Sequence, residues 1–396
     1  MKKILYISGS LGLGHIARDL AIAKELRSQF PDVEINWIAY EPALSVLIRA
    51  GEKTVPEFDS YNNDNLQAEA TSKGTELSLL MYSFKSLGKW FQNANLVKKI
   101  LKQNDFDLII GDETYELLIP LILKTLKFDI PFVIIYDFLG LDAMSNNPIE
   151  HLIGFLMNWL WSLDHRIFSK SNNLALFVGE LKDVPVKRFS IIAPNRREYA
   201  RKYYNFLGYI LPFNPDEYND KKRIRKKLGY DNKPLVICSI GGTSIGKELL
   251  ELCAEAYPMV KEKIPDLHMV LVCGPRLPIE SLNIPKDMDI RQFVPDLFEH
   301  FAASDLAVVQ GGGSTTLELT ALKKPFIYFP LVGHTEQENI SLRLQSYRAG
   351  IRMSYVDTDA KMLAGAIIKN ISTNVNYKDI PLNGSKNAVE LLSKFF

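Results

Sequence analysis

Short apolar runs alternate with longer amphipathic segments along the whole chain, and this alternation limits the fold more than any other feature of the sequence. In the first half the apolar runs are 4–8, 33–39, 108–110 and 132–136. In the second half they are 235–240, 269–273, 306–310 and 326–329. Strands that alternate with helices are typical of βαβ units around a parallel sheet. The sequence therefore predicts an α/β protein with two parallel sheets.

Chain length and a proline-rich segment predict two domains. The chain has 396 residues and a mass of 45.0 kDa, more than one hydrophobic core usually organises. Pro212 and Pro215 cannot continue a helix or a central strand, and they lie between the two α/β patterns. The expected division is a first domain at 1–208, a linker at 209–217, a second domain at 218–376 and, at 377–396, a C-terminal helix that packs back on the first domain.

Charge, hydropathy and cysteine usage exclude several classes of protein. The 47 basic and 46 acidic residues give a net charge of +1, so no overall field attracts the chain to nucleic acid or to an anionic bilayer. The basic run 221–227 is better explained as the solvated face of a helix that ends at Gly229. No apolar stretch reaches the roughly 18 residues of a spanning helix, and the first apolar run is too short for a signal-peptide core. Cys238, Cys253 and Cys273 form no CxxC pair, so we expect buried thiols and a cytoplasmic protein.

The first candidate site is the glycine-rich turn that ends in His15, between the first expected strand and the helix at 16–29. A histidine at a helix start, above the carboxyl edge of a parallel sheet, is placed to act as a general base. A role in the turn or in helix capping explains it equally well. Gly12, Gly14 and Ala17 also fit a dinucleotide-binding fingerprint, in which Glu41 would hold a ribose. That fingerprint should begin directly at the strand end, whereas four residues separate the strand from Gly12.

Two carboxylates follow another expected strand of the first domain. Asp112 and Glu113 come directly after the run 107–111, at the same sheet edge as His15. A carboxylate there can orient the imidazole and stabilise it once it is protonated. Alternatively, Asp112 caps a helix that begins near Thr114.

Glycine-rich loops also follow two expected strands of the second domain. After the first of these strands, Gly241, Gly242 and Thr243 precede a helix whose N–H groups can bind phosphate, although glycines also end strands for steric reasons. The segment 311–318 is more specific, because three glycines are followed by three hydroxyl residues and then by Glu318. The hydroxyls and the helix N-terminus suit a diphosphate, and Glu318 can accept hydrogen bonds from both ribose hydroxyls. A capped helix with a solvated glutamate would not explain three successive glycines.

A polar cluster at 334–339 follows the next expected strand. Its side chains have the chemistry to hold sugar hydroxyls. His334 and Glu336 are also typical metal ligands, but no third ligand occurs at a suitable spacing. We therefore expect no metal site.

Together these motifs resemble the inverting glycosyltransferases of the GT-B fold, especially family 28, which includes the bacterial enzyme that adds N-acetylglucosamine to lipid I. The resemblance spans most of the chain and is most specific over about 290–340, where the family's motifs recur in order at 293–297, 303–306, 312–315, 318 and 336–337. It implies two Rossmann-like domains that face each other across a cleft. It also implies a nucleotide-sugar substrate, with a UDP-sugar favoured, and no cofactor.

The resemblance also implies roles for individual residues. The residues that it assigns to the donor are Gly14, Gly242, Thr243, Phe293, Val294, Gly312, Gly313, Ser314, Thr315, Glu318, Glu336 and Gln337. His15 matches the histidine that takes the acceptor proton, and Asp112 is similar to the aspartate that supports it in related small-molecule glycosyltransferases. The chain departs from the family where Asn339 follows Gln337 by two residues instead of three, and in the Ser-Leu-Gly-Leu-Gly loop before His15.

The sequence therefore predicts an inverting transferase that moves a hexosyl group from a nucleotide-sugar to an acceptor hydroxyl. A nucleotide-sugar 2-epimerase of the same fold and a non-catalytic nucleotide-sugar binding protein are the alternatives. An NAD-dependent oxidoreductase would leave the cluster at 311–337 unexplained. Neither the acceptor nor the oligomeric state follows from the sequence.

One apolar, tryptophan-bearing segment bears on the acceptor. The segment 149–163 has the pattern of a wide apolar helix, which favours a core helix or a dimer contact. The alternative is a helix that lies in a lipid headgroup region. In that case the acceptor is lipid-linked or belongs to the cell envelope, and the protein binds the inner face of the cell membrane peripherally.

Overall fold

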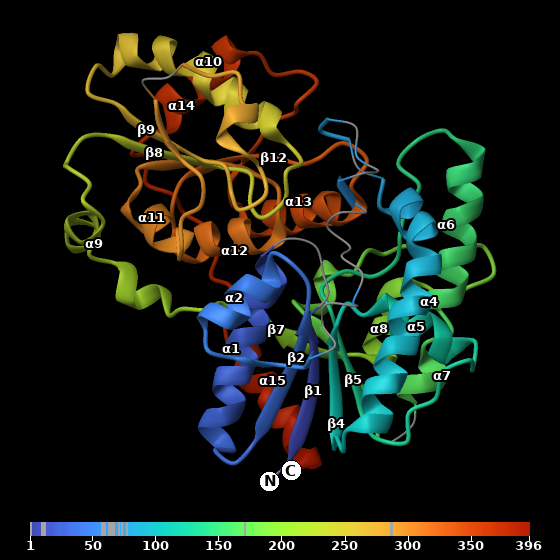
Figure 1. Cartoon of the computed structure of the whole chain (residues 1–396). Coiled ribbons are helices and arrows are strands. Elements are labelled where there is room, and N and C mark those ends of the chain that lie inside the picture. The colour runs from blue at the N-terminus through green and yellow to red at the C-terminus, as the bar shows by residue number, and fades with distance from the viewer. Residues whose placement is uncertain are drawn as a thin grey trace. The chain divides into compact units, whose positions relative to one another are not determined.

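The computed structural model describes residues 2–8, 13–56, 61, 68–69, 72, 74–76, 78–169, 172–285 and 288–396. The chain divides into two compact units (Figure 1). Unit 1 consists of Met1–Thr71, Ser78–Pro212 and Pro381–Phe396, and unit 2 of Ser72–Leu77 and Phe213–Ile380. Each unit is built on one parallel sheet, which confirms the predicted α/β fold with two such sheets.

Unit 1 contains a seven-stranded sheet in the order β3-β2-β1-β4-β5-β6-β7. Its strands are β1 (Lys3–Ser8), β2 (Glu34–Ala39), β3 (Lys53–Thr54), β4 (Leu108–Asp112), β5 (Phe132–Tyr136), β6 (Leu174–Val178) and β7 (Asn205–Gly208). The central strands are apolar on both faces because helices cover both sides of a parallel sheet.

Two groups of helices cover that sheet (Figure 1). On one face lie α1 (Gly14–Gln29), α2 (Ala43–Arg49) and α15 (Gly384–Leu392), which share a core with the strands. On the other lie α4 (Leu79–Gln103), α5 (Tyr115–Ile122), α6 (Pro148–Trp161), α7 (His165–Phe168) and α8 (Arg196–Tyr203). The C-terminal α15 is fixed to unit 1 by Asn387, whose Nδ2 donates to the carbonyl of Leu207 at 2.8 Å.

Unit 2 contains a six-stranded sheet in the order β10-β9-β8-β11-β12-β13. Its strands are β8 (Leu235–Ser239), β9 (His268–Val272), β10 (Asp289–Arg291), β11 (Leu306–Gln310), β12 (Phe326–Phe329) and β13 (Ile351–Arg352). Helices α10 (Lys247–Lys263) and α14 (Ala360–Asn370) cover one face, and α11 (Leu297–Ala303), α12 (Gly313–Ala321) and α13 (Thr335–Tyr347) the other (Figure 1). The basic run forms α9 (Lys221–Leu228), which ends at Gly229 in the left-handed conformation, as predicted.

A short piece of the first half of the chain also belongs to unit 2. The N–H of Val332 donates to the carbonyl of Thr75 at 3.0 Å, and Glu76 forms a parallel bridge with Val332. The sequence showed no sign of this excursion. Within the described ranges, no helix is long and apolar enough to cross a bilayer. The three cysteines are buried and free, as expected.

Candidate active site

Each sheet contains one switch point, where neighbouring strands are followed by helices on opposite faces. In unit 1 it lies between β1, which leads into α1, and β4, which leads into α5. In unit 2 it lies between β8, which leads into α10, and β11, which leads into α12. Ligands of open α/β sheets bind at the carboxyl ends of the strands at such points. The sequence motifs of both halves fall there.

His15 and Asp112 meet at the switch point of unit 1. Helix α1 begins at Gly14, so His15 lies in its first turn, and Asp112 is the last residue of β4. The Nδ1 atom of His15 lies 3.0 Å from Oδ2 of Asp112. Asp112 is not the cap residue of α5, because that position is occupied by Thr114, whose side chain makes no capping hydrogen bond. Gly14 opens α1, while Gly12 lies outside the described residues.

Arg18 contacts both His15 and Asp112, and the sequence motifs did not predict it as a site residue. Its Nε donates to Oδ2 of Asp112 at 3.1 Å, and its Nη2 donates to Oδ1 of the same carboxylate. Nη1 donates to Oδ2 of Asp137 at 2.6 Å, and Nη2 lies 2.7 Å from Nδ1 of His15. The sequence did contain a hint of this contact. Residues three apart share one face of a helix, and Arg18 follows His15 by three positions.

The carboxylates around Arg18 differ in protonation. Burial raises the pKa of Asp112 and of Asp137, but the charges of Arg18 and then of His15 outweigh burial and hold both pKa values below the usual range. Burial and the negative charge of Asp137 raise the pKa of Glu113 well above its usual value. The surroundings therefore favour the ionised form of Asp112 and of Asp137, and the protonated form of Glu113.

Helix α12 presents an uncapped N-terminus at the switch point of unit 2. It begins at Gly313 after the cap residue Gly312, and no side chain of the described residues caps it. The hydroxyl of Thr316 donates back to the carbonyl of Gly312 at 2.8 Å. The N–H groups of Gly313, Ser314 and Thr315 are thus left for a ligand, and the helix dipole favours an anion.

The two glycines before α12 have different roles. A Cβ on Gly311 would lie 3.0 Å from Cα of Pro330, so packing requires a glycine there. A Cβ on Gly312 would meet no described atom within 4 Å. Open space therefore adjoins the helix N-terminus, where a phosphate needs it.

The loop after β8 is tied to the end of β11. Gln310 donates from Nε2 to the carbonyl of Ile245 at 3.1 Å. Gly246 starts α10 with a φ of +92°, and a Cβ there would clash with the same Nε2. Gly242 and Thr243 lie in this loop and are partly buried. The structure therefore brings the two glycine-rich loops of unit 2 to one sheet edge.

Glu318 lies one turn inside α12, near the loop that follows β10. It is partly buried, and burial together with the negative charge of Asp296 raises its pKa to about 8. Asp296 precedes α11 with a φ of +49°. Phe293 is partly buried and Val294 is buried in the same loop. The residues expected at the ribose and the base therefore belong to one neighbourhood.

Two side chains of the polar cluster at the start of α13 form hydrogen bonds with the backbone. Oε1 of Gln337 accepts from the N–H of Leu331 at 2.7 Å, and the side chain is buried, so this bond uses its oxygen and not its NH2 group. Nδ1 of His334 accepts from the N–H of Gln337 at 3.4 Å and so caps α13. Glu336 lies in the first turn and is partly buried. No group of three or more potential metal ligands occurs among the residues that the structure describes.

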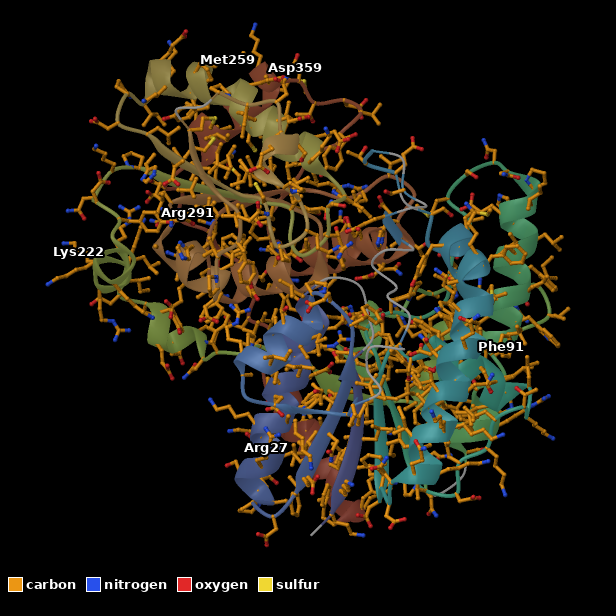
Figure 2. All side chains as sticks on the ribbon, in the orientation of Figure 1. Arg27, Phe91, Lys222, Met259, Arg291 and Asp359 are labelled. Atoms are coloured by element: carbon orange, nitrogen blue, oxygen red, sulfur yellow. The ribbon has the colours of Figure 1, made fainter. Side chains whose placement is uncertain are left out.

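One face of α6 is exposed and apolar. Its residues, which we call the α6 stripe, are Ile149, Leu152, Leu156 and Trp159, with exposed fractions of 61%, 59%, 48% and 40%. Phe91, which projects from α4 in Figure 2, is 38% exposed. The interpretation of this segment as a core helix is wrong for the stripe, although Ile153 and Trp161 on the same helix are buried.

Comparisons with known proteins find similarity to glycosyltransferases. Residues 236–391 match the model of the glycosyltransferase family 28 C-terminal domain. An uncharacterized glycosyltransferase of Methanosarcina mazei is 25% identical, and the alignment covers 100% of this chain and 98% of the relative. The UDP-N-acetylglucosamine--N-acetylmuramyl-(pentapeptide) pyrophosphoryl-undecaprenol N-acetylglucosamine transferase of Clostridioides difficile is 22% identical over 93% of this chain and 81% of the relative.

Solved structures show the same fold. The glycotransferase of kitacinnamycin superposes with a TM-score of 0.64 at 13% identity, covering 100% of this chain and 99% of the other. MurG of Acinetobacter baumannii superposes with a TM-score of 0.52 at 15% identity, covering 100% of both chains. Residues 236–391 are therefore similar to the glycosyltransferase family 28 C-terminal domain, and the chain is a glycosyltransferase with the GT-B fold.

Proposed function

We propose that this glycosyltransferase moves a hexosyl group from a UDP-sugar to a hydroxyl of a lipid-linked acceptor, with inversion and without a metal ion. The observation that carries the proposal is the contact between His15 and Asp112 at the switch point of unit 1. Nδ1 also lies 2.7 Å from Nη2 of Arg18, so the proposal requires the tautomer in which Nδ1 carries the ring proton and donates it to the buried carboxylate. In that tautomer Nε2 is bare, which is the arrangement of a general base.

The reaction is a single displacement. Nε2 of His15 takes the proton of the acceptor hydroxyl, and the acceptor oxygen forms a bond to the anomeric carbon as the bond to the diphosphate breaks. The imidazolium that results is stabilised by Asp112. The diphosphate leaves with its negative charge, which the N–H groups at the start of α12 and the loop around Gly242 accept. Inversion follows because no enzyme nucleophile takes part.

The donor half of the proposal rests on unit 2. Glu318 accepts hydrogen bonds from the ribose hydroxyls, the loop of Phe293 and Val294 contacts the base, and Glu336 with the NH2 group of Gln337 holds the sugar. The preference for uridine is supported by the bacterial relatives, whose names give UDP-N-acetylglucosamine as their donor.

The acceptor half rests on the α6 stripe. Four large apolar side chains on one helix face are costly to leave in water, and an amphipathic helix of this kind binds at a membrane interface. The names of the bacterial relatives describe an acceptor on pyrophosphoryl-undecaprenol, which is a lipid carrier. We therefore place the enzyme peripherally on the inner face of the cell membrane.

Nucleotide release provides the test. The protein is incubated with UDP-N-acetylglucosamine or UDP-glucose, with or without EDTA, and with either the lipid extract or the aqueous extract of a membrane preparation. We expect UDP release that depends on the lipid extract, persists in EDTA and is lost in His15→Ala. Release that needs only the aqueous extract would reject the lipid acceptor. Conversion of the donor without any acceptor would indicate the 2-epimerase.

A further inference from the structure

A β-turn with two isoleucines lies in unit 1 between β6 and α8. The N–H of Ala193 donates to the carbonyl of Ser190 at 3.2 Å, so Ile191 and Ile192 occupy the two central positions of the turn. Their exposed fractions are 86% and 70%. Central positions of turns normally hold glycine, proline, asparagine, aspartate or serine, so turn chemistry does not explain two β-branched apolar side chains in water.

The turn is the tip of a short segment that we call the 188–195 hairpin, and the base of this hairpin is fixed. Its two sides pair as an antiparallel bridge between Arg188 and Asn195. The ring of Phe189 is buried and packs edge-on against Tyr199, with the ring centroids 5.2 Å apart. The two isoleucines therefore stay exposed, because the residues beneath them are already packed.

The chain around the tip is basic. The segment 184–197 has no acidic residue and four basic ones, Lys187, Arg188, Arg196 and Arg197. Asp142 offsets one of these charges, because it accepts from Nη1 and Nη2 of Arg196 at 3.2 and 2.8 Å and lies 3.0 Å from Nζ of Lys187. An excess of positive charge therefore remains at the tip, although the net charge of the whole chain is only +1.

The hairpin is tied to the loop that follows β5, at the sheet edge that holds the candidate active site of unit 1. That loop begins at Asp137, whose Oδ2 accepts from Nη1 of Arg18 at 2.6 Å, and Asp142 follows five residues later. Between them, Gly140 has a φ of +84°, and a Cβ there would clash with Arg196. The hairpin and the candidate active site therefore lie at the same edge, joined by one short loop.

We propose that the 188–195 hairpin is a docking site for the anionic phospholipids of a membrane surface. Ile191 and Ile192 enter the apolar side of the headgroup region. Lys187 and Arg188 bind lipid phosphates. The inference deepens the proposed function and rests on it in one respect, the placement of unit 1 at a membrane. It goes beyond that function by assigning a second contact, apart from the α6 stripe, and the charge of the lipid.

Shape and charge favour a bilayer over a protein partner. An apolar anchor in a protein interface needs a matching pocket, whereas a bilayer accepts any exposed apolar tip. Anionic lipid also attracts basic side chains within about a Debye length of the surface. Helix α6 contains no lysine or arginine, so its stripe supplies apolar area without this attraction. The hairpin supplies the electrostatic part of the contact.

A fluorescent probe at the tip tests the contact. The three cysteines of the chain are buried, so Ile191→Cys can be labelled selectively with an NBD maleimide, whose emission increases when it leaves water. The full chain is mixed with vesicles of phosphatidylcholine, alone or with phosphatidylglycerol. We expect the emission to increase only with phosphatidylglycerol, and the increase to become smaller in high salt. The same probe in Val356→Cys, in unit 2, should not respond.

Unlabelled variants separate the apolar part of the contact from the electrostatic part. In co-sedimentation with the mixed vesicles, Ile192→Ser should weaken binding about tenfold, because the burial of one large side chain is lost. Lys187→Gln combined with Arg188→Gln should also weaken it about tenfold. The control, Lys261→Gln combined with Lys263→Gln, removes the same charge from the exposed end of α10 and should bind as the wild type does. Thermal unfolding checks that all variants are folded.

The remaining outcomes distinguish this inference from the proposed function. If the wild type binds vesicles but the probe at Ile191→Cys stays silent, the hairpin is not the contact and the membrane placement rests on the α6 stripe. An equal response to phosphatidylcholine alone would overturn the assignment of anionic lipid. Emission that increases with protein concentration, without vesicles, would make the hairpin a contact between two copies. Absence of any vesicle binding would overturn both the hairpin and the membrane placement. If the probe responds but UDP release needs only the aqueous extract, the hairpin stands and the lipid-linked acceptor is wrong.

Discussion

Nδ1 of His15 and Oδ2 of Asp112 lie 3.0 Å apart although 97 positions separate the two residues in the sequence. The register of the sheet explains this, because β1 pairs with β4 so that Ser8 lies opposite Asp112, and α1 begins six residues after Ser8, at Gly14. Strand pairing, not local sequence, therefore creates the pair.

The first prediction is that His15→Ala lowers turnover without weakening donor binding. Loss of a general base costs roughly 10²- to 10⁴-fold in rate, whereas the proposed donor contacts lie in unit 2. Turnover is measured as UDP release and donor binding as the Kd of UDP by calorimetry. We expect the Kd to stay within about twofold of the wild type.

The chain offers a matched control for this prediction. His268 and Asp289 form a similar pair at 2.9 Å, but they begin β9 and β10 and so lie at the amino edge of the sheet. His268→Ala should leave turnover unchanged, provided that the variant is folded as well as the wild type is. A similar loss of turnover in both variants would contradict the assignment of His15 as the general base.

A second prediction concerns Glu318 and pH. Because burial and Asp296 raise its pKa to about 8, Glu318 is mostly protonated at pH 7 and becomes a full acceptor for ribose hydroxyls only above pH 8. The affinity for UDP should therefore increase from pH 6.5 to pH 9 and become nearly independent of pH in Glu318→Gln. Calorimetry across this range, with Glu255→Gln on the exposed face of α10 as control, provides the check. A wild-type affinity that falls with pH would exclude Glu318 as the ribose acceptor.

A third prediction compares two glycines at which an added Cβ would have no described atom within 4 Å. Gly312→Ala should fold normally, since its φ is −69°, but its methyl group would occupy the space expected for the diphosphate. UDP binding should weaken about tenfold or more, equivalent to about 1.4 kcal/mol. Gly365→Ala, inside α14, should keep the affinity and raise the stability by about 0.5–1 kcal/mol. Equal affinities in the two variants would contradict the placement of the phosphates.

The sequence was sufficient for eight strands and for the glycine-rich loops, but it did not predict β3, β6, β7, β10 and β13. Apolar runs of three to seven residues between helical segments leave few alternatives to a parallel sheet, and the run at 306–310 became β11 without change. Loops that follow such strands must lie at the carboxyl edge, so His15, Asp112 and Gly313 could be placed there from the sequence alone.

What the sequence did not reveal depends on long-range contacts. Arg18 looked like one charge on an amphipathic helix, because its two carboxylate partners follow it by 94 and 119 positions. The excursion that pairs Glu76 with Val332 is a short extended piece without periodicity. The α6 stripe was ambiguous for another reason, since apolar periodicity identifies a face but not what covers it.

A fourth prediction concerns the α6 stripe and lipid. Leu152→Ser combined with Trp159→Ser should reduce binding to vesicles of phosphatidylcholine and phosphatidylglycerol, because about 1.5–3 kcal/mol of burial energy is lost for each large side chain. Co-sedimentation measures the bound fraction. Val356→Ser removes an even more exposed side chain from unit 2, at 78% exposure, and should bind as the wild type does. If the wild type does not bind vesicles but forms a dimer that the double variant abolishes, the stripe is a protein interface.

A last prediction follows from the buried carboxyl of Asp164. Tyr136 donates to it at 3.2 Å, and Tyr199 and Tyr204 donate to it as well, but burial outweighs these bonds and raises its pKa to about 7 from 3.8. A carboxyl with a raised pKa in the folded state binds its proton more tightly than the unfolded chain does. Its contribution to stability is therefore complete below pH 4 and is lost as the pH rises through 7.

The expected loss from Asp164 between pH 4 and pH 8 is a few kcal/mol, on the order of 1.4 kcal/mol for each unit of the pKa shift. Asp164→Asn cannot titrate, so the difference in melting temperature between pH 5 and pH 8 should shrink in this variant. Asp266→Asn, on the surface, should keep the wild-type difference. If Asp164→Asn retained the full pH dependence, that dependence would have to come from Asp19 and Glu113, the two carboxyls near Arg18 whose pKa values are also raised. The three tyrosines would then be holding Asp164 as an anion.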